Sequence, residues 1–176
     1  MKKESIFNFI ETFLVLILVI LPVRFFLFEP FLVKGQSMEP NFYNYDYLII
    51  DKLSYFFRNP ERGEVIVFRP PVDKKVYYIK RIIGLPGERI EIKDSKIKIF
   101  NKENPGGFVL DENYLNGHYT FGDLEITLSN DEYFVLGDNR EVSYDSRKWG
   151  PVKKKDISGR VVFHFSLIKL SQALSR

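Results

Sequence analysis

Short apolar runs separated by turn sequences recur along most of this chain, and they limit it to a mainly β, antiparallel fold. The composition agrees, because the sequence holds 17 Phe and 10 Tyr while its only alanine, the best helix former, is Ala173. Turns such as Leu85-Pro86-Gly87 favour short connections between neighbouring strands. The predicted strands cover residues 47–51, 64–68, 76–83, 89–92, 95–100, 124–128, 133–136 and 159–165.

One main domain is expected, since 176 residues suffice for a single core with an appendage. We predict that it occupies residues 29–176. Residues 93–130 are more polar and rich in glycine turns, which predicts a β-ribbon insertion. A short helical or irregular connector is expected over 51–57, and a weakly helical tail that packs on the core over 166–176.

Charge and residue counts exclude several classes of function. The net charge of +3 is small and the basic residues are dispersed, which argues against a nucleic-acid partner. The absence of cysteine excludes disulfides, thiolate catalysis and cysteine-ligated metals. His118 and His164 have no metal-ligand spacing and are interpreted as surface or packing residues. We therefore expect no metal site and no cofactor.

The segment from Ser5 to Phe28 is almost entirely apolar, interrupted by Glu11 and Arg24. As a helix it would be about 36 Å long, enough to cross a hydrocarbon core of roughly 30 Å. A cleavable signal peptide is the alternative, but residues 22–34 lack the small side chains that cleavage needs. We predict that residues 1–28 form a short cytoplasmic N-terminus and one transmembrane helix.

The orientation follows from Lys2 and Lys3, which precede the apolar segment. Positive charges tend to stay in the cytoplasm, so the domain after Phe28 is expected outside it. The predicted location is the cytoplasmic membrane, with a single span and an extracytoplasmic domain.

Two residues could carry chemistry together. Ser37 lies in the run Gly35-Gln36-Ser37-Met38-Glu39-Pro40, and Lys80 lies in the predicted strand 76–83, where alternate side chains are bulky and apolar. Burial lowers the pKa of a lysine, by as much as about 3 to 5 units, so that a neutral amine can take a proton from a serine. Arginine cannot do this. Taken singly, each residue also fits an ordinary turn or an edge strand.

Four segments in order resemble the bacterial type I signal peptidases: residues 29–40, 62–68, 78–88 and 137–147. The resemblance extends from the apolar segment to Gly159, and Gly-Asp-Asn-Arg-x-x-Ser-x-Asp-Ser-Arg is its most specific motif. It implies a coiled antiparallel sheet of the Ser/Lys protease type. It also implies a serine endopeptidase that removes N-terminal signal peptides from exported preproteins after a small-x-small motif.

By the same resemblance, Ser37 is the nucleophile and Lys80 the general base. Ser143 hydrogen-bonds the lysine and orients it, and Asp145 and Arg147 brace this last motif. The motif residues interpreted as scaffold around the site are Gly137, Asp138, Asn139 and Arg140.

Substrate binding is assigned in the same way. Phe31 and Val33 are expected to line shallow pockets for small side chains, beside the strand before Ser37, with which an extended peptide can pair. The backbone N–H of Ser37 is one expected oxyanion donor. Some members of the family carry a hydroxyl two residues before the nucleophile, but this chain has Gly35 there. The second donor is left open.

Two other functions stay open. One is a specialised Ser/Lys protease that matures a single pilus or conjugation protein, and the other is a relative that binds exported peptides without cutting them. Soluble self-cleaving repressors with this dyad are disfavoured, because an apolar segment stands where they carry a DNA-binding domain. The expected partners are signal peptides and the lipid bilayer, and the expected state is a monomer.

Overall fold

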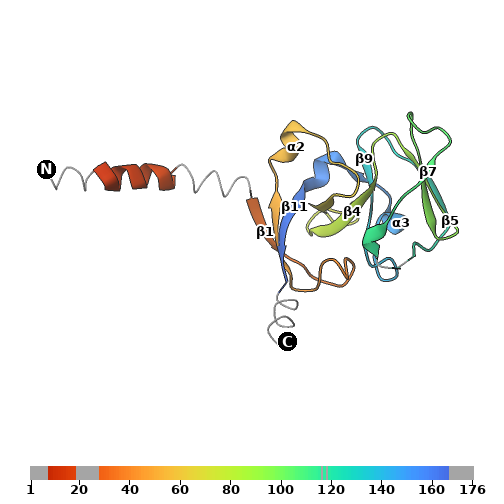
Figure 1. Cartoon of the computed structure of the whole chain (residues 1–176), viewed down its shortest axis with the longest axis horizontal. Helices are drawn as coiled ribbons and strands as arrows, with labels where there is room; N and C mark the ends of the chain where they lie inside the picture. The colour runs from red at the N-terminus through yellow and green to blue at the C-terminus, as the bar shows by residue number, and fades with distance from the viewer. Residues whose placement is uncertain (1–7, 19–27, 116, 118, 167–176) are drawn as a thin grey trace.

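Two antiparallel sheets are the main elements of the structure described between residues 28 and 166 (Figure 1). The computed structural model describes residues 8–18, 28–115, 117 and 119–166. The larger sheet holds, from edge to edge, β1 (Phe28–Leu32), β2 (Tyr47–Asp51), β11 (Ile157–Phe165), β3 (Val65–Phe68), β4 (Tyr78–Gly84), β9 (Glu132–Leu136) and β10 (Val152–Lys153). The smaller sheet holds β7 (Phe108–Val109), β6 (Lys96–Phe100), β5 (Arg89–Lys93) and β8 (Leu124–Thr127).

Helices are few and short in the described part of the domain. Two α-helices are α2 (Ser54–Phe57) and α3 (Ser146–Trp149), and two 3-10 turns are η1 (Asn113–Leu115) and η2 (Lys154–Asp156). The prediction of a mainly β, antiparallel fold is confirmed, and α2 lies within the predicted connector 51–57.

Strand β3 shows why the long apolar runs fold as they do. All four of its residues are buried, with Val65 and Val67 on one side of the sheet and Ile66 and Phe68 on the other. Because side chains alternate across a strand, a central strand covered on both faces needs an uninterrupted apolar run. The neighbouring strand β4 pairs with it so that Ile66 lies opposite Lys80.

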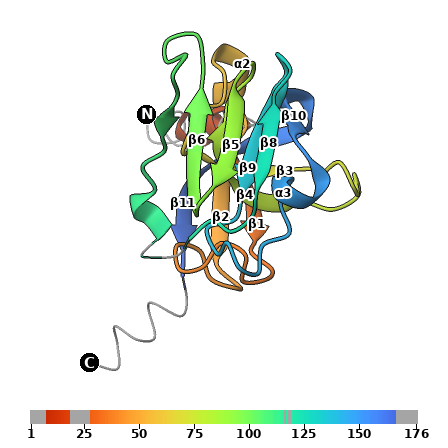
Figure 2. The ribbon, with the colours of Figure 1, turned by 90° about the vertical axis from the view of Figure 1, so that its right-hand side faces the viewer.

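The smaller sheet packs against the larger one through a separate cluster of isoleucines. Ile90 and Ile92 of β5 and Ile97 and Ile99 of β6 are buried with Phe134 and other residues of the larger sheet. Figure 2 shows β6, β5 and β8 standing in front of β9 and β4. The sheet begins at Arg89 and has four strands, so it differs from the ribbon expected over 93–130. Alternation identified β5 as a strand, but it does not tell which sheet the strand joins.

Two strands were absent from the prediction, β7 and β10, and β1 was expected only as a strand before Ser37 without bounds. Strands β7 and β10 have two residues each, too few to show a period. Strand β1 contains Pro30, which weakens a strand pattern but is tolerated because β1 lies at the sheet edge.

The N-terminal helix is described over residues 8–18. Among the residues that the structure describes, none belongs to a helix long and apolar enough to cross a membrane. Three parts of the prediction lie outside the described residues: residues 1–7 and 19–27 of the predicted N-terminus and anchor, the predicted tail beyond Ser166, and His118. His164 is described, and its ring lies 4.8 Å from the ring of Phe42.

Candidate active site

The loop from β1 to β2 carries Ser37. Its ends are tied together by backbone hydrogen bonds, from Val33 N to Asp46 O and from Tyr45 N to Val33 O, both 2.9 Å long. Gly35 takes a φ of +97°, a conformation that L side chains rarely adopt, and its N–H donates to the Asn44 side chain at 2.9 Å. Met38 is buried in the core directly after the serine, so the loop is anchored there.

Lys80 reaches this loop from β4. Its side chain is 4 % exposed, and its Nζ lies 2.6 Å from Ser37 Oγ and 2.9 Å from the carbonyl oxygen of Ile79. The Tyr78 ring lies 5.7 Å from the same nitrogen. The structure thus brings together two residues that are far apart in sequence, a hydroxyl and an amine within hydrogen-bond distance.

Burial changes the chemistry of this amine. Desolvation lowers the pKa of Lys80 from 10.5 to about 8, while the charges of Asp145 and Asp138 act in the opposite direction. Each of these carboxylates is itself paired with an arginine, which limits its effect on the lysine. A substantial fraction of the amine is therefore neutral near pH 8, and a neutral amine can act as a base.

Ser143 lies beside the site without making the hydrogen bond that was expected. Its Oγ is buried and has no hydrogen-bond partner among the described residues, and Lys80 donates to Ser37 and Ile79 instead. Its N–H donates to Asn139 O at 3.1 Å, which fixes its backbone. The expectation that Ser143 orients Lys80 is therefore not met by a contact in this structure.

Gly137 explains how these groups fit so closely. A Cβ at this position would lie 2.2 Å from Ser143 Oγ and 2.3 Å from the carbonyl oxygen of Ser37. The same carbonyl accepts a hydrogen bond of 3.1 Å from Asn139 N. Only glycine leaves space for the nucleophile loop and the Ser143 side chain to meet at this point.

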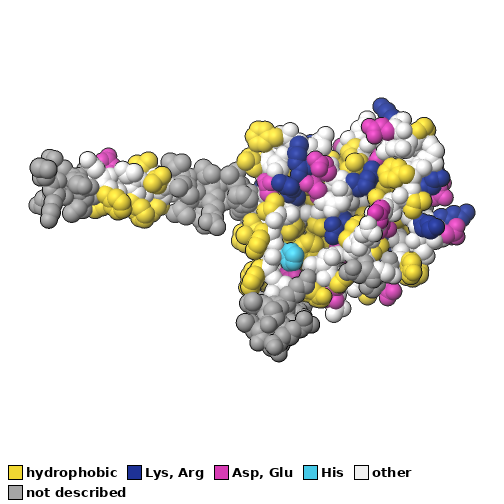
Figure 3. Space-filling model, viewed as in Figure 1, with side chains coloured by type: hydrophobic (Ala, Val, Ile, Leu, Met, Phe, Trp, Pro, Cys, Tyr) yellow, Lys and Arg dark blue, Asp and Glu magenta, His cyan; other side chains and the backbone are white. Residues whose placement is uncertain are grey.

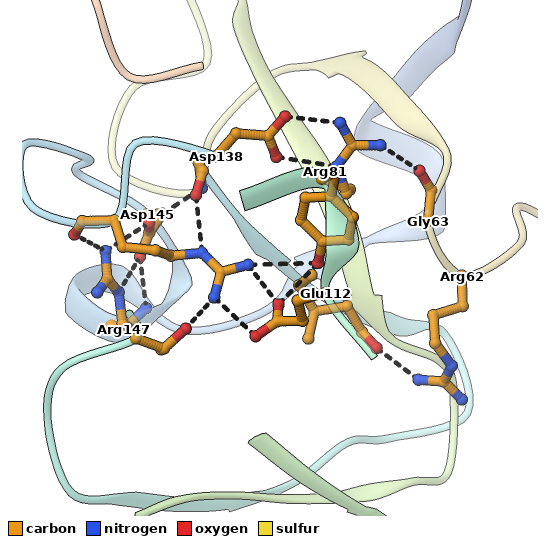
Figure 4. A network of polar contacts seen from close by, with 12 residues as sticks. Arg62, Gly63, Arg81, Glu112, Asp138, Asp145 and Arg147 are labelled. Carbon is orange, nitrogen blue, oxygen red and sulfur yellow. Dashed lines mark hydrogen bonds and ion pairs between the residues drawn. The ribbon is translucent and has the colours of Figure 1, made fainter. Parts of the chain in front are cut away.

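Asp145 and Arg147 form a two-point ion pair behind the site (Figure 4). The guanidinium of Arg147 donates to both carboxylate oxygens, at 2.8 and 2.9 Å, and Asp145 is fully buried. The carboxylate also accepts from Gly137 N at 3.1 Å, and Arg147 donates to Arg140 O at 2.7 Å. The pair therefore holds both ends of the segment from Gly137 to Arg147.

A second ion pair joins this segment to β4. Arg81 donates to both oxygens of the buried Asp138, at 2.8 and 2.6 Å, and to Gly63 O at 2.8 Å (Figure 4). Asn41, from the nucleophile loop, donates to the same carboxylate at 2.8 Å. The sequence analysis did not anticipate this link. Residue types alone give no signal for such a pair.

Arg140 connects the site to the smaller sheet region. Its side chain is fully buried and bonds Glu112, at 2.5 and 3.2 Å, together with Thr120. Its Nε donates to Gly137 O at 2.9 Å. The scaffold thus spans both sheets, and Glu112 is a further residue that the sequence did not reveal.

A groove of about 500 Å³ opens beside Ser37 and Lys80. One wall is the chain from Phe31 to Ser37, and the other is the chain from Tyr77 to Lys80. Phe31 and Val33 both line it, with Phe31 held edge-on to Tyr77 at 5.1 Å between ring centroids. Lining residues that the sequence analysis did not single out are Leu48, Val67, Val142 and Tyr144.

A serine hydroxyl and a buried amine within hydrogen-bond distance, beside a groove, are groups that a hydrolase with a serine nucleophile requires. Comparison with known proteins agrees with this class. The family model described as signal peptidase, peptidase S26, matches residues 6–166. The chain therefore belongs to the signal peptidase family, whose members are serine proteases.

Individual relatives match over most of their length. Signal peptidase I P of Bacillus subtilis subsp. natto is 38% identical over 170 residues, which cover 90% of this chain and 88% of the relative. Signal peptidase IB of Staphylococcus aureus strain COL is 32% identical, over 94% of this chain and 91% of the relative. A crystal structure of a signal peptidase I from Enterococcus faecalis is similar with a TM-score of 0.50 and 32% identity, covering 58% of this chain and 97% of that one.

Proposed function

We propose that this protein is a membrane-anchored serine endopeptidase that removes signal peptides from exported preproteins after a small-x-small motif. Ser37 is the nucleophile and Lys80 the general base. The observation that carries the proposal is the 2.6 Å contact between Ser37 Oγ and the buried Lys80 Nζ. The named relatives, which are signal peptidases I, support the choice of substrate.

The reaction follows from the two groups. With Lys80 neutral, the Ser37 hydroxyl donates its proton to Nζ while Oγ attacks the scissile carbonyl carbon. The resulting oxyanion is stabilised by the N–H of Ser37, and Lys80 returns the proton to the departing amine as the peptide bond breaks. Lys80 then takes a proton from water, which attacks the acyl carbon. As the bond between this carbon and Ser37 Oγ breaks, Lys80 returns the proton to Oγ, and the signal peptide leaves with a new carboxylate.

The groove supports the choice of an extended peptide as substrate. Its two walls are β1 with the chain that follows it and the start of β4, so a peptide can lie between them as an added strand. We assign Phe31 and Val33 to its pockets, where their bulk leaves room for small side chains only. Gly35 has no side-chain hydroxyl that could act as the second oxyanion donor. Its backbone N–H already donates to Asn44, so we do not assign it that role either.

The anchor is part of the same proposal. Residues 5–28 are assigned to a single transmembrane segment, which would hold the groove near the outer face of the membrane, where the cleavage site of a signal peptide emerges. The protein would then lie in the cytoplasmic membrane as a monomer, with its catalytic domain outside the cytoplasm.

The test is cleavage of a preprotein with an Ala-x-Ala site by the purified, detergent-solubilised protein, followed by sequencing of the new N-terminus. We expect one cut after the motif, and no cut with Ser37→Ala, Lys80→Ala or Lys80→Arg. Cleavage of only one dedicated pilin-like substrate would favour the specialised protease. Binding without any cleavage would favour the non-catalytic relative, and full activity of Lys80→Arg would refute the neutral amine.

A further inference from the structure

Lys34 is a cation in the wall of the catalytic groove that the proposed reaction does not use. It lines the groove between Val33 and Gly35, and its side chain is exposed. Among the described residues, none forms a hydrogen bond or an ion pair with its ammonium group. A solvated lysine is an ordinary feature of a protein surface, but one that lines a substrate groove also acts on the peptide that binds there.

Two other exposed lysines of the domain have acidic partners. Lys74 lies 2.7 Å from Asp156, and Lys52 lies 3.2 Å from Glu29. In several places on the face drawn in Figure 3, basic side chains lie beside acidic ones. The groove differs, because none of the described residues that line it is Asp or Glu. The charge of Lys34 is therefore not compensated within the groove.

Burial alternates along the wall that carries Lys34. Phe31 is half-buried, and Val33 is buried in the core. Leu32 and Lys34 are both exposed. Because neighbouring side chains of an extended chain point to opposite sides, Leu32 and Lys34 lie on the side of this wall that faces away from the core.

A peptide that pairs with this wall has the same alternation. Strand β1 is the edge strand of the larger sheet, and the backbone N–H and C=O of Val33 bond the chain just before β2, so the opposite edge is free to pair. Side chains at neighbouring positions of adjacent strands point to the same face. The two small residues of a small-x-small motif face the pockets assigned to Phe31 and Val33, so the middle residue faces the side of Lys34.

We propose that Lys34 selects the middle residue of the cleavage motif by charge, and that it favours Glu or Asp there over Lys or Arg. The inference rests on the proposed function, since it takes Phe31 and Val33 as the pocket residues. An exposed pair of opposite charges attracts and an exposed pair of like charges repels, each weakly because water and salt screen the charges. Together the two effects correspond to about threefold to tenfold in kcat/KM between a Glu and a Lys substrate.

The test compares three peptides that differ only at the middle position, with Ala-Glu-Ala, Ala-Gln-Ala and Ala-Lys-Ala before the cut. The full chain is assayed in a non-ionic detergent at low ionic strength, so that no detergent charge competes with Lys34. We expect kcat/KM to fall in the order Glu, Gln, Lys. Salt at about 1 M is expected to bring the three values together, since the screening length is then only about 3 Å.

Variants of Lys34 assign the preference to this side chain. Lys34→Glu is expected to reverse the order of the three peptides, Lys34→Gln to remove it and Lys34→Arg to keep it. The matched control is Lys102→Glu, which makes the same change in net charge at an exposed lysine outside the groove and is expected to keep the wild-type order. A merely structural role of Lys34 would change kcat/KM for all three peptides by the same factor.

A binding measurement separates this inference from the proposed function. The affinity of the three peptides for the Ser37→Ala protein is measured by fluorescence anisotropy, which needs no cleavage. Equal cleavage of the three peptides, or an order that Lys34→Glu leaves unchanged, overturns the role of Lys34 and leaves the proposed function intact. If the wild-type chain cleaves none of the peptides, the proposed function is overturned. The affinities then decide the role of Lys34 alone: a preference for Glu over Lys that Lys34→Glu reverses supports it, and equal affinities overturn it.

Discussion

The burial of Lys80 has a consequence for stability that can be measured without any substrate. Below pH 8 the folded protein carries a charged amine on Lys80, a residue that is 4 % exposed, whereas the unfolded chain keeps that charge in water. The pKa falls from 10.5 to about 8, and each unit corresponds to about 1.4 kcal/mol. Near neutral pH the lysine therefore lowers the free energy of unfolding by about 3 kcal/mol.

The perturbation is Lys80→Met, which keeps the length of the side chain and removes the charge. It also removes the hydrogen bonds to Ser37 and Ile79, each worth about 1 kcal/mol or less in net terms. We expect the variant to be inactive and more stable than wild type at pH 7, by about 1 to 3 kcal/mol.

The pH dependence supplies the sign of this effect. Between pH 8 and 10.5 the unfolded chain binds more protons at this lysine than the folded protein, so stability rises with pH in that window. The destabilisation caused by the buried charge of Lys80 is fully present below pH 8 and disappears above pH 10.5. The advantage of Lys80→Met is therefore expected to shrink steadily between these two pH values.

Urea denaturation followed by tryptophan fluorescence measures both quantities. Trp149 is the only tryptophan, and its ring lies 5.9 Å from that of Phe68 in the core, so it reports the unfolding of the domain. Lys96→Met, which changes an exposed lysine of β6, is the matched control and is expected to be nearly neutral at every pH. A Lys80→Met variant that is no more stable than wild type at pH 7, with a difference independent of pH, would refute the reasoning.

Three further results are expected. The kcat/KM for a preprotein rises through pH 7 to 9 with a midpoint near 8, as the amine of Lys80 becomes neutral; a profile flat from pH 5 to 10 would indicate another base. Gly137→Ala lowers kcat at least tenfold while thermal unfolding shows a folded protein, because its Cβ would displace Ser37 or Ser143. Glu112→Gln lowers the free energy of unfolding by about 2 to 4 kcal/mol in urea titrations, because it leaves the buried Arg140 charge without its partner. Glu125→Gln, which breaks an exposed ion pair, is the control and lowers this free energy by less than about 1 kcal/mol.

The sequence predicts those parts of the fold that local patterns determine. The run Tyr47–Asp51 is a strand with the predicted bounds, and the apolar stretch that includes Val65–Phe68 is a strand buried on both faces. Period and turn residues suffice for these elements, since they depend on neighbours along the chain. Strand β5 pairs locally with β6, but its other partner, Ile126 of β8, is distant in sequence, and no local pattern contains that pairing.

Part of the candidate site could likewise be predicted from the sequence, and part could not. The motifs predict Ser37 and Lys80 as site residues, and the structure places these two side chains in contact. The partners of Asp138 could not be predicted, because Arg81 and Asn41 reach it from two other segments of the chain. The Ser143 hydroxyl, expected to bond Lys80, has no hydrogen-bond partner in the described residues, and the amine of Lys80 bonds Ser37 and Ile79. Residue types therefore indicate which side chains could belong to the site, whereas the packing of distant segments determines which of these side chains are in contact.

The arginine partners of the two buried aspartates have a role that connects the scaffold to the base. Asp145 and Asp138 both raise the pKa of Lys80, against the effect of burial. Arg147 opposes the charge of Asp145 at 2.8 Å, so Arg147→Gln is expected to raise the pKa of Lys80 and to move the midpoint of the kcat/KM profile to higher pH. A purely structural role would lower activity at every pH without moving the midpoint, so an unchanged midpoint would exclude the electrostatic role. Arg62→Gln is the matched control, because it unpairs Glu88, which is not among the groups that shift the pKa of Lys80.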